Sequence, residues 1–277
     1  MGYKDLLVHL DDGRGCATRV AVALGLAARH GAHLTGLYTI GEGPLAAYVR
    51  AHVPADLRTR LEAETRARSE AVLADFREAA ERAGVAWETR TERTLDAPLA
   101  RVLSVHARPA DLVVLGQMGP DAPAGAPRHL PGEVVMASGR PVLVVPESGA
   151  FETLGERVVV AWDASRAAAR AVGDAMPILE RAASILVVTV NPTEGHGELP
   201  GADIAVHLAR HGIEVEVQTV ETDQMSAGEV LLSFATDGGR DLLVMGAYGH
   251  PRLRQLVLGG VTRTVLERMT LPVLMAH

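Results

Sequence analysis

Four glycines near the end of the chain have the spacing of a loop that binds phosphate. Gly246 and Gly249 are followed, after nine residues, by Gly259, Gly260, Val261 and Thr262. Glycine lets a backbone approach a phosphate closely and tolerates positive φ. Free N–H groups at the start of a helix, reinforced by the helix dipole, favour an anion, and the Thr262 hydroxyl suits the same oxygens. The pattern lacks the Gly-Lys-Ser/Thr of a Walker loop, and a tight strand-to-helix connection is its alternative interpretation.

A carboxylate is expected on the same side of the molecule as this loop. Asp163 follows the buried-strand pattern of residues 157–162, and Gly246 follows that of residues 241–245. In a parallel sheet covered by helices, ligands bind beyond the carboxyl ends of the strands, near the point where strand order reverses. Asp163 is therefore a candidate acceptor of hydrogen bonds from a ribose or an adenine amino group.

The elements that must position these residues occur twice. Three segments of the first half resemble three of the second, in the same order: Asp5–Asp11 and Arg157–Asp163, Asp111–Gly116 and Asp241–Gly246, Arg140–Val145 and Leu271–Ala276. This self-similarity indicates a duplication of about half the chain. We therefore predict two domains, residues 1–149 and 156–277, separated by a segment that contains glycine, serine and proline. The first half has extra residues around 41–82, which include a helical pattern from Ala55 to Ala83.

Strands alternate with helices in each half. In the second half, strands are predicted at residues 158–162, 184–190, 213–220, 242–245 and 273–276, and helices at 165–181, 202–211, 227–236 and 261–269. This alternation predicts an α/β fold with two tandem doubly wound domains, each a five-stranded parallel sheet with helices on both faces.

Composition narrows the class of function. Aromatic residues make up 3% of the chain, too few for a surface that stacks nucleic-acid bases, and the net charge of -7 disfavours general binding to nucleic acid or to an anionic membrane. Cys16 is the single cysteine, which excludes an intramolecular disulfide and a thiolate metal cluster. Because the start of the sequence lacks a signal-peptide pattern and no apolar run reaches about 18 residues, we expect a cytoplasmic protein without membrane insertion.

The glycine motif, its preceding apolar strand and the Pro-Val-Leu strand that follows resemble the universal stress protein family. Ser165, two residues after Asp163, fits the same pattern. The resemblance implies an adenine nucleotide alpha hydrolase-like fold that, in one subclass, binds ATP, ADP or AMP, with Mg²⁺ as an optional companion. The cofactor-binding residues it implies are Asp163, Val190, Gly246, Gly249, Gly259, Gly260, Val261 and Thr262. The glycines and Thr262 would hold the phosphates, and Asp163 and Val190 would flank the adenine and ribose.

The resemblance also implies how the domains associate. They are expected to pair through their last strands as an internal pseudo-dimer, and whole chains are expected to form a homodimer. The first half departs from the motif. When Pro141 is aligned with Pro272, Arg128 and His129 replace the two glycines, and Pro131, which has no N–H, replaces Thr262. We therefore predict one nucleotide per chain.

Other candidate residues have weaker patterns. His207 and His211 are four residues apart on a predicted helix, with His196 before them. This spacing can bind zinc, but without a cysteine or a clear third ligand we expect a plain surface and no metal site. His250, Arg252 and Arg254 lie in the nine-residue loop, where contact with phosphate and exposure to solvent are both open.

The sequence thus predicts a stress-response protein that binds adenine nucleotide through its C-terminal domain and regulates an unknown protein partner. We expect no enzyme, because no Ser-His-Asp set or two-carboxylate metal site is apparent. The alternatives are a scaffold of the same fold that binds no nucleotide, and a very slow ATPase that uses Asp163 and Mg²⁺.

Overall fold

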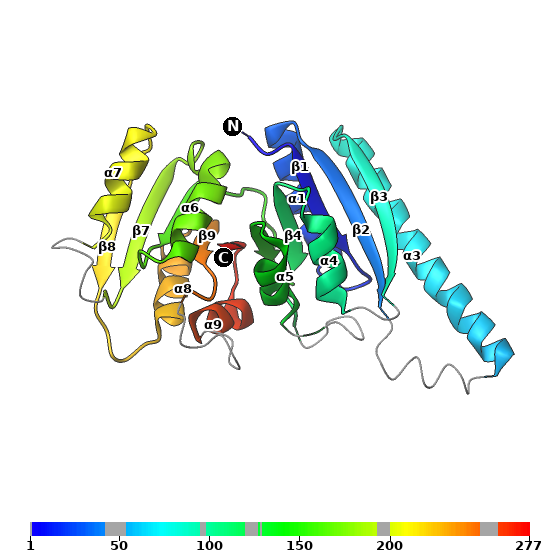
Figure 1. Cartoon of the computed structure of the whole chain (residues 1–277). Coiled ribbons are helices and arrows are strands. Elements are labelled where there is room, and N and C mark those ends of the chain that lie inside the picture. The colour runs from blue at the N-terminus through cyan, green and yellow to red at the C-terminus, as the bar shows by residue number, and fades with distance from the viewer. Residues whose placement is uncertain are drawn as a thin grey trace.

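The computed structural model describes residues 2–41, 54–94, 98–119, 127, 129–192, 200–249 and 260–277. These residues form one continuous sheet with helices on both sides (Figure 1). The strands are β1 (Asp5–Leu10), β2 (His33–Gly41), β3 (Trp87–Thr94), β4 (Leu112–Gly116), β5 (Val142–Val145), β6 (Arg157–Ala161), β7 (Ser184–Val190), β8 (Glu216–Val220), β9 (Leu242–Gly246) and β10 (Val273–Ala276). The helices are α1 (Cys16–His30), α3 (Ala55–Ala83), α4 (Leu99–Ala107), α5 (Leu130–Ser138), α6 (Arg166–Leu179), α7 (Ala202–Arg210), α8 (Ala227–Asp237) and α9 (Gly260–Arg268).

The sheet consists of two parallel halves with the same internal order. The full order is β3-β2-β1-β4-β5-β10-β9-β6-β7-β8. Within each half neighbouring strands run parallel, whereas β5 and β10 pair antiparallel, with Leu274 opposite Leu143. The structure therefore has the predicted doubly wound α/β fold, and the last strands of the two halves join as the internal pseudo-dimer that was predicted.

The core explains why the inner strands are continuous apolar runs. Both faces of the sheet are covered there, so inner-strand residues pointing either way are buried, whereas the edge strand β8 is largely exposed. On one face the strands pack against α1, α3, α6 and α7, and on the other against α4, α5, α8 and α9. β4, for example, is buried at every position.

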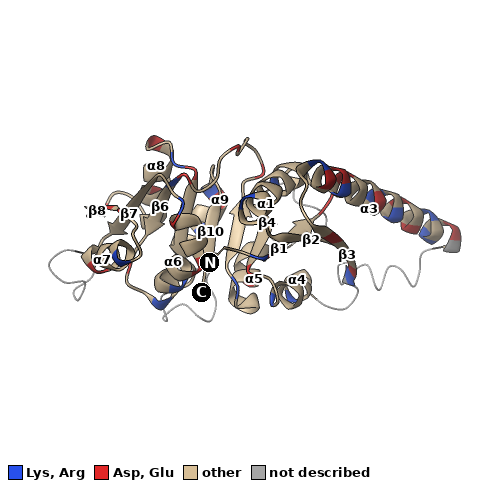
Figure 2. Cartoon of the chain, turned by 90° about the horizontal axis from the view of Figure 1, so that it is seen from above, with Lys and Arg blue, Asp and Glu red and all other residues tan. Residues whose placement is uncertain are grey.

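One strand boundary differs from the sequence prediction, and the long helix of the first half is confirmed. β8 begins at Glu216 rather than at residue 213, because the N–H of Ile213 closes α7 by donating to Leu208 O, one residue after Gly212 in the left-handed conformation. The predicted helix Ala55–Ala83 is confirmed as α3, which projects beyond the first half (Figure 1). Charged residues of both signs alternate along α3 (Figure 2), as expected for a helix exposed to solvent.

Several hydrogen bonds join the two halves besides the strand pair. The Tyr3 hydroxyl donates to Asp174 O at 2.8 Å, Arg181 Nη1 donates to Arg29 O at 2.8 Å, and Gln117 Nε2 donates to Leu266 O at 2.9 Å. Together with β5 and β10, these contacts make the two domains one packed body. None of the helices in the described ranges has the length and apolar character needed to cross a membrane.

Candidate functional site

The second domain has its topological switch point between β6 and β9. β6 pairs with β7 on one side and with β9 on the other, so a ligand-binding crevice is expected beyond the carboxyl ends of β6 and β9. The structure brings Asp163, which follows β6, close to Gly249, which follows β9. A Cβ atom on Gly249 would lie 3.8 Å from Asp163 Oδ2 and 3.0 Å from Ser165 Oγ. Both Asp163 and Gly249 are exposed to solvent.

The turn between β6 and α6 orients Asp163. Ala164 adopts a positive φ of 54°, and the Ser165 N–H donates to Asp163 Oδ1 at 3.0 Å. Ser165 is the N-cap of α6, and its Oγ accepts from the Ala168 N–H at 3.1 Å. The carboxylate of Asp163 is thus held at the amino end of α6, beside the glycine turn.

The close packing of the end of β9 against α6 requires glycine at position 246. A Cβ atom there would come within 2.5 Å of the backbone nitrogen of Ala168 and 2.6 Å of the carbonyl carbon of Ala167. Only glycine lets the end of β9 lie this close to α6, as the glycine that serves helix–strand packing does in dinucleotide-binding folds. Gly246 therefore positions the turn, and the predicted contact with phosphate is not needed to explain it.

The first residues of α9 differ in how far they are buried. Thr262 is buried, with 3% of its surface exposed, and its Oγ1 accepts from the Tyr248 N–H at 3.4 Å. Val261 is half-buried and packs against the core. Gly260 is exposed, and, apart from its chain neighbours and the backbone of α9, no atom of the described residues lies within 4 Å of where its Cβ would be. Among the described residues no contact requires glycine at position 260, whereas Thr262 joins the helix to the turn after β9.

Several residues named from the sequence lie outside the described ranges. They are Arg128, His196, His250, Arg252, Arg254 and Gly259. His207 and His211 are described, and their ring centroids are 4.9 Å apart. Within the described part of the chain, no group of three or more His, Cys, Asp or Glu side chains could hold a metal ion.

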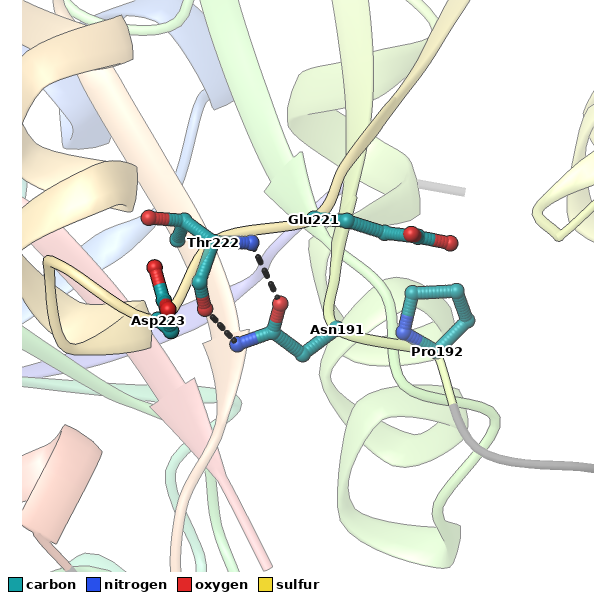
Figure 3. Close-up of a pocket in the computed structure, with 5 residues that line it drawn as sticks. All are labelled: Asn191, Pro192, Glu221, Thr222 and Asp223. Carbon is teal, nitrogen blue, oxygen red and sulfur yellow. Dashed lines mark hydrogen bonds between the residues drawn. The ribbon is translucent and has the colours of Figure 1, made fainter.

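Val190 lies at the last position of β7 and is half-buried against the core. Beyond it, Asn191 has a positive φ of 47° and joins the segments that follow β7 and β8. Its Nδ2 donates to Thr222 O at 2.9 Å, and its Oδ1 accepts from the Thr222 N–H at 2.8 Å (Figure 3). Asn191, Pro192, Glu221, Thr222 and Asp223 line an open hollow of about 550 Å³. Sequence reasoning missed Asn191, although an Asn before a Pro at a strand end is a turn signal.

The equivalent crevice of the first domain is filled by its own side chain. It lies beyond β1 and β4, where Arg19 of α1 is 98% buried. Arg19 Nη2 donates to Asp11 Oδ2 at 2.8 Å and Nε donates to His9 O at 2.7 Å. A Cβ on Gly116, at the end of β4, would overlap Arg19 Nη1. The guanidinium group therefore occupies the space beyond the strand ends.

The protonation states around Arg19 follow from burial and charge. Burial, together with the charge of Arg19, lowers the pKa of His9 to about 4, so its ring is neutral at pH 7, and its Nε2 pairs with Thr39 Oγ1 at 2.8 Å. Burial alone would raise the pKa of Asp11, but Arg19, His9 and the Gly13 N–H together hold it below the ordinary value. Asp11 and Arg19 thus form a buried ion pair.

The prediction that the first domain binds no nucleotide rested on its loop, which lacks the two glycines, and did not consider Arg19. The signal was present in the repeat, because the residue eight positions after Asp11 is Arg19, whereas the residue eight positions after Asp163 is Ala171. Ala171 is fully buried. Burial raises the pKa of the Cys16 thiol at the start of α1, which disfavours the reactive thiolate form.

The fold and the two crevices define a tandem α/β protein of doubly wound topology, with one crevice bordered by a carboxylate and exposed glycines and the other filled by an ion pair. The chain belongs to the universal stress protein family, whose model matches residues 2–146 and 155–277.

Individual proteins are similar to this chain in sequence or in fold. The chain is 30% identical over 172 residues to a universal stress protein of Synechocystis, a stretch covering 59% of this chain and 57% of that relative, so it spans less than two thirds of the relative's length. A universal stress protein from Archaeoglobus fulgidus has a similar fold, with a TM-score of 0.72 and 17% identity over 98% of this chain and 97% of its own. A putative universal stress protein from Pseudomonas aeruginosa gives a TM-score of 0.61 and 16% identity, over 98% and 92%.

Proposed function

We propose that this chain is a stress-response regulator that binds one adenine nucleotide, ATP, ADP or AMP, in the crevice between β6 and β9. The observation that carries the proposal is the contrast between the two switch points. The first is filled by Arg19 and its partner Asp11, whereas in the second Gly249 lies beside Asp163, and Gly249 and Gly260 are both exposed to solvent. Among the described residues, and leaving aside the backbone of α9 itself, nothing lies near the Cβ position of Gly260, so a phosphate could approach the backbone closely there.

The residues of the second crevice suit different parts of a nucleotide. The amino ends of α6 and α9 and the exposed backbone at Gly249 and Gly260 favour phosphate. Asp163 suits the ribose hydroxyls or a phosphate-bound Mg²⁺. The hollow beside Asn191 contains Glu221 and Asp223, whose charge would repel phosphate, so it suits the ribose or the adenine amino group. Thr262 would act by holding Tyr248 in place.

The first domain has a supporting role in this proposal. Removing Arg19 from its crevice would leave Asp11 buried without its cation, so a nucleotide would have to displace a buried ion pair to bind there. The proposed output is a change in contacts with a protein partner rather than catalysis.

Isothermal titration of the purified chain with ATP, ADP and AMP tests the proposal. Gly260→Val should abolish binding, because the added methyl groups would lie in the open space at the start of α9. The matched control is Gly173→Val on α6, another exposed helical glycine with no atom within 4 Å of its would-be Cβ, and it should bind like the wild type. Absence of binding by the wild-type chain at millimolar nucleotide would refute the proposal and leave a scaffold. Phosphate release lost with Gly260→Val would instead indicate an ATPase.

A further inference from the structure

We propose that Tyr248 is a positioning residue that makes nucleotide binding in the second domain depend on helix α5 of the first domain. This inference rests on the proposed function, because it concerns the same crevice. Tyr248 lies between Ala247 and Gly249, in the turn that leads from β9 toward the glycine motif.

The backbone of Tyr248 is fixed to the elements that border the crevice. Its N–H donates to Oγ1 of Thr262, in the first turn of α9. The preceding residue, Ala247, donates to Ala276 O at 2.8 Å, and its own carbonyl pairs with His277 Nδ1 at 2.8 Å. Tyr248 also has a positive φ of 59°, a conformation that side chains other than glycine adopt rarely and that the surrounding contacts must maintain. A shift of its side chain would therefore change the turn at Gly249 and the start of α9.

The side chain of Tyr248 crosses to the first domain. A Cβ atom on Gly132, in the first turn of α5, would overlap the Tyr248 hydroxyl oxygen and lie 3.1 Å from the ring carbon Cζ. The hydroxyl oxygen is buried and has no hydrogen-bond partner among the described residues. Burial, together with the charge of Glu133, raises the pKa of Tyr248 to about 12, so the hydroxyl is neutral at pH 7. The ring thus fits against α5 only because residue 132 has no side chain.

A second contact holds α9 from the same side. Gln117, which follows β4 of the first domain, donates from Nε2 to the carbonyl of Leu266 at 2.9 Å, near the carboxyl end of α9. Its Oε1 accepts from the Glu147 N–H at 3.3 Å. Helix α9 is therefore joined to the first domain by Gln117 near its last turn and, through Thr262 and Tyr248, at its first turn. The two domains share the helix whose amino end borders the crevice.

Coupling follows from this arrangement. A phosphate at Gly249 and Gly260 would lie next to the backbone of Tyr248, and the position of that backbone is linked through the ring to Gly132. Coupling of this kind is reciprocal. If a bound nucleotide shifts the conformational equilibrium of α5, a change at α5 shifts the affinity for nucleotide by the same factor. The first domain, whose own crevice is filled, would then sense or adjust the occupancy of the second.

The test places the perturbation in the first domain, away from the crevice. Gly132→Ala would push the Tyr248 hydroxyl aside, and we expect it to weaken binding of AMP or ATP about tenfold. Adding Tyr248→Phe removes the oxygen that a Cβ at residue 132 would overlap, so the double variant should bind within about threefold of the wild type. The control is Gly25→Ala on α1, a helical glycine of the same domain with no atom within 4 Å of its would-be Cβ, and its affinity should be unchanged.

Thermal unfolding without nucleotide is measured for the same proteins. A purely structural contact would change the melting temperature of Gly132→Ala and leave its dissociation constant unchanged, and this result would overturn the inference. If Gly132→Ala does not fold, amide hydrogen exchange of the wild type replaces it: saturating AMP should slow exchange in α5 but not in α4, and equal exchange with and without AMP would overturn the inference. A wild-type chain that binds no nucleotide refutes the proposed function itself, whereas a wild type that binds alongside an unaffected Gly132→Ala refutes the coupling alone.

Discussion

Replacing Arg19 with Met should destabilise the chain far more than the loss of an ion pair on the protein surface does. The side chains of Asp11 and Arg19 are 9% and 3% exposed and are joined at 2.8 Å. Methionine fills much of the same volume but leaves Asp11 buried without its cation, while Gly13 still donates to it at 2.9 Å. Removing one partner of a buried ion pair costs about 3–5 kcal/mol, and we expect that loss in the free energy of unfolding at pH 7.

Urea denaturation followed by circular dichroism measures this cost at several pH values. In the wild type, the lowered pKa of Asp11 contributes stability that is complete above its unfolded value of 3.8 and is lost as the pH falls through the folded pKa. In Arg19→Met, burial without the cation raises the pKa of Asp11, so the variant takes up a proton as the pH falls. The difference between variant and wild type should therefore be largest at pH 7 to 8 and shrink toward pH 5, values chosen around the ordinary titration range of carboxylates.

A surface pair provides the matched control. Arg170 pairs with Asp174 at 2.8 Å, but the Arg170 side chain is 52% exposed, so Arg170→Met should cost less than about 1 kcal/mol. Asp11→Asn combined with Arg19→Met should recover much of the loss, because the charge is then gone. If Arg19→Met costs no more than Arg170→Met, or its cost is the same at pH 5 and pH 8, the buried pair does not close the first crevice as described.

Three further predictions concern other parts of the structure. The pKa of His9 is lowered from 6.5 to about 4, so the wild type should lose about 3 kcal/mol of stability as the pH falls from 6.5 to 4; urea titrations should show this loss absent in His9→Asn, and an unchanged slope would contradict the assignment. Gly246→Ala should lower the free energy of unfolding by about 2 kcal/mol without any nucleotide, because its Cβ would meet the backbone of Ala168, and an unchanged melting temperature would contradict that packing role. Ser226 and Glu229 form a capping box at α8, so Ser226→Ala should cost about 1 kcal/mol in urea unfolding, and a neutral result would mean that the cap contributes nothing.

Periodicity and repetition predicted most of the fold. The apolar strand runs of the second half and their copies in the first half lead directly to two doubly wound domains, since both faces of such strands must be buried. The end of β8 was predicted correctly but its start was not, because the Ile213 N–H completes the preceding helix instead of entering the sheet. A local pattern of apolar residues does not show whether the first of them begins a strand or closes the helix before it.

The site was predictable only in outline. Asp163 and Gly249 were named from the sequence, and the structure brings them together because β6 and β9 are neighbours. The spacing of the motif could not separate the roles of Gly246 and Gly260. Gly246 must be glycine because a Cβ there would meet the backbone of α6, whereas the described residues place no such contact at Gly260. Tyr248 escaped notice because its partner lies in the other half of the chain, which no local motif records.

Counting the nucleotides bound to each chain tests the central claim most directly. Native mass spectrometry of the full chain with saturating ATP or AMP should show one nucleotide per chain, because Arg19 fills the first crevice and exposed glycines border the second. Gly260→Val should reduce that number to none. Two nucleotides per wild-type chain, or one that remains bound to Gly260→Val, would contradict the account.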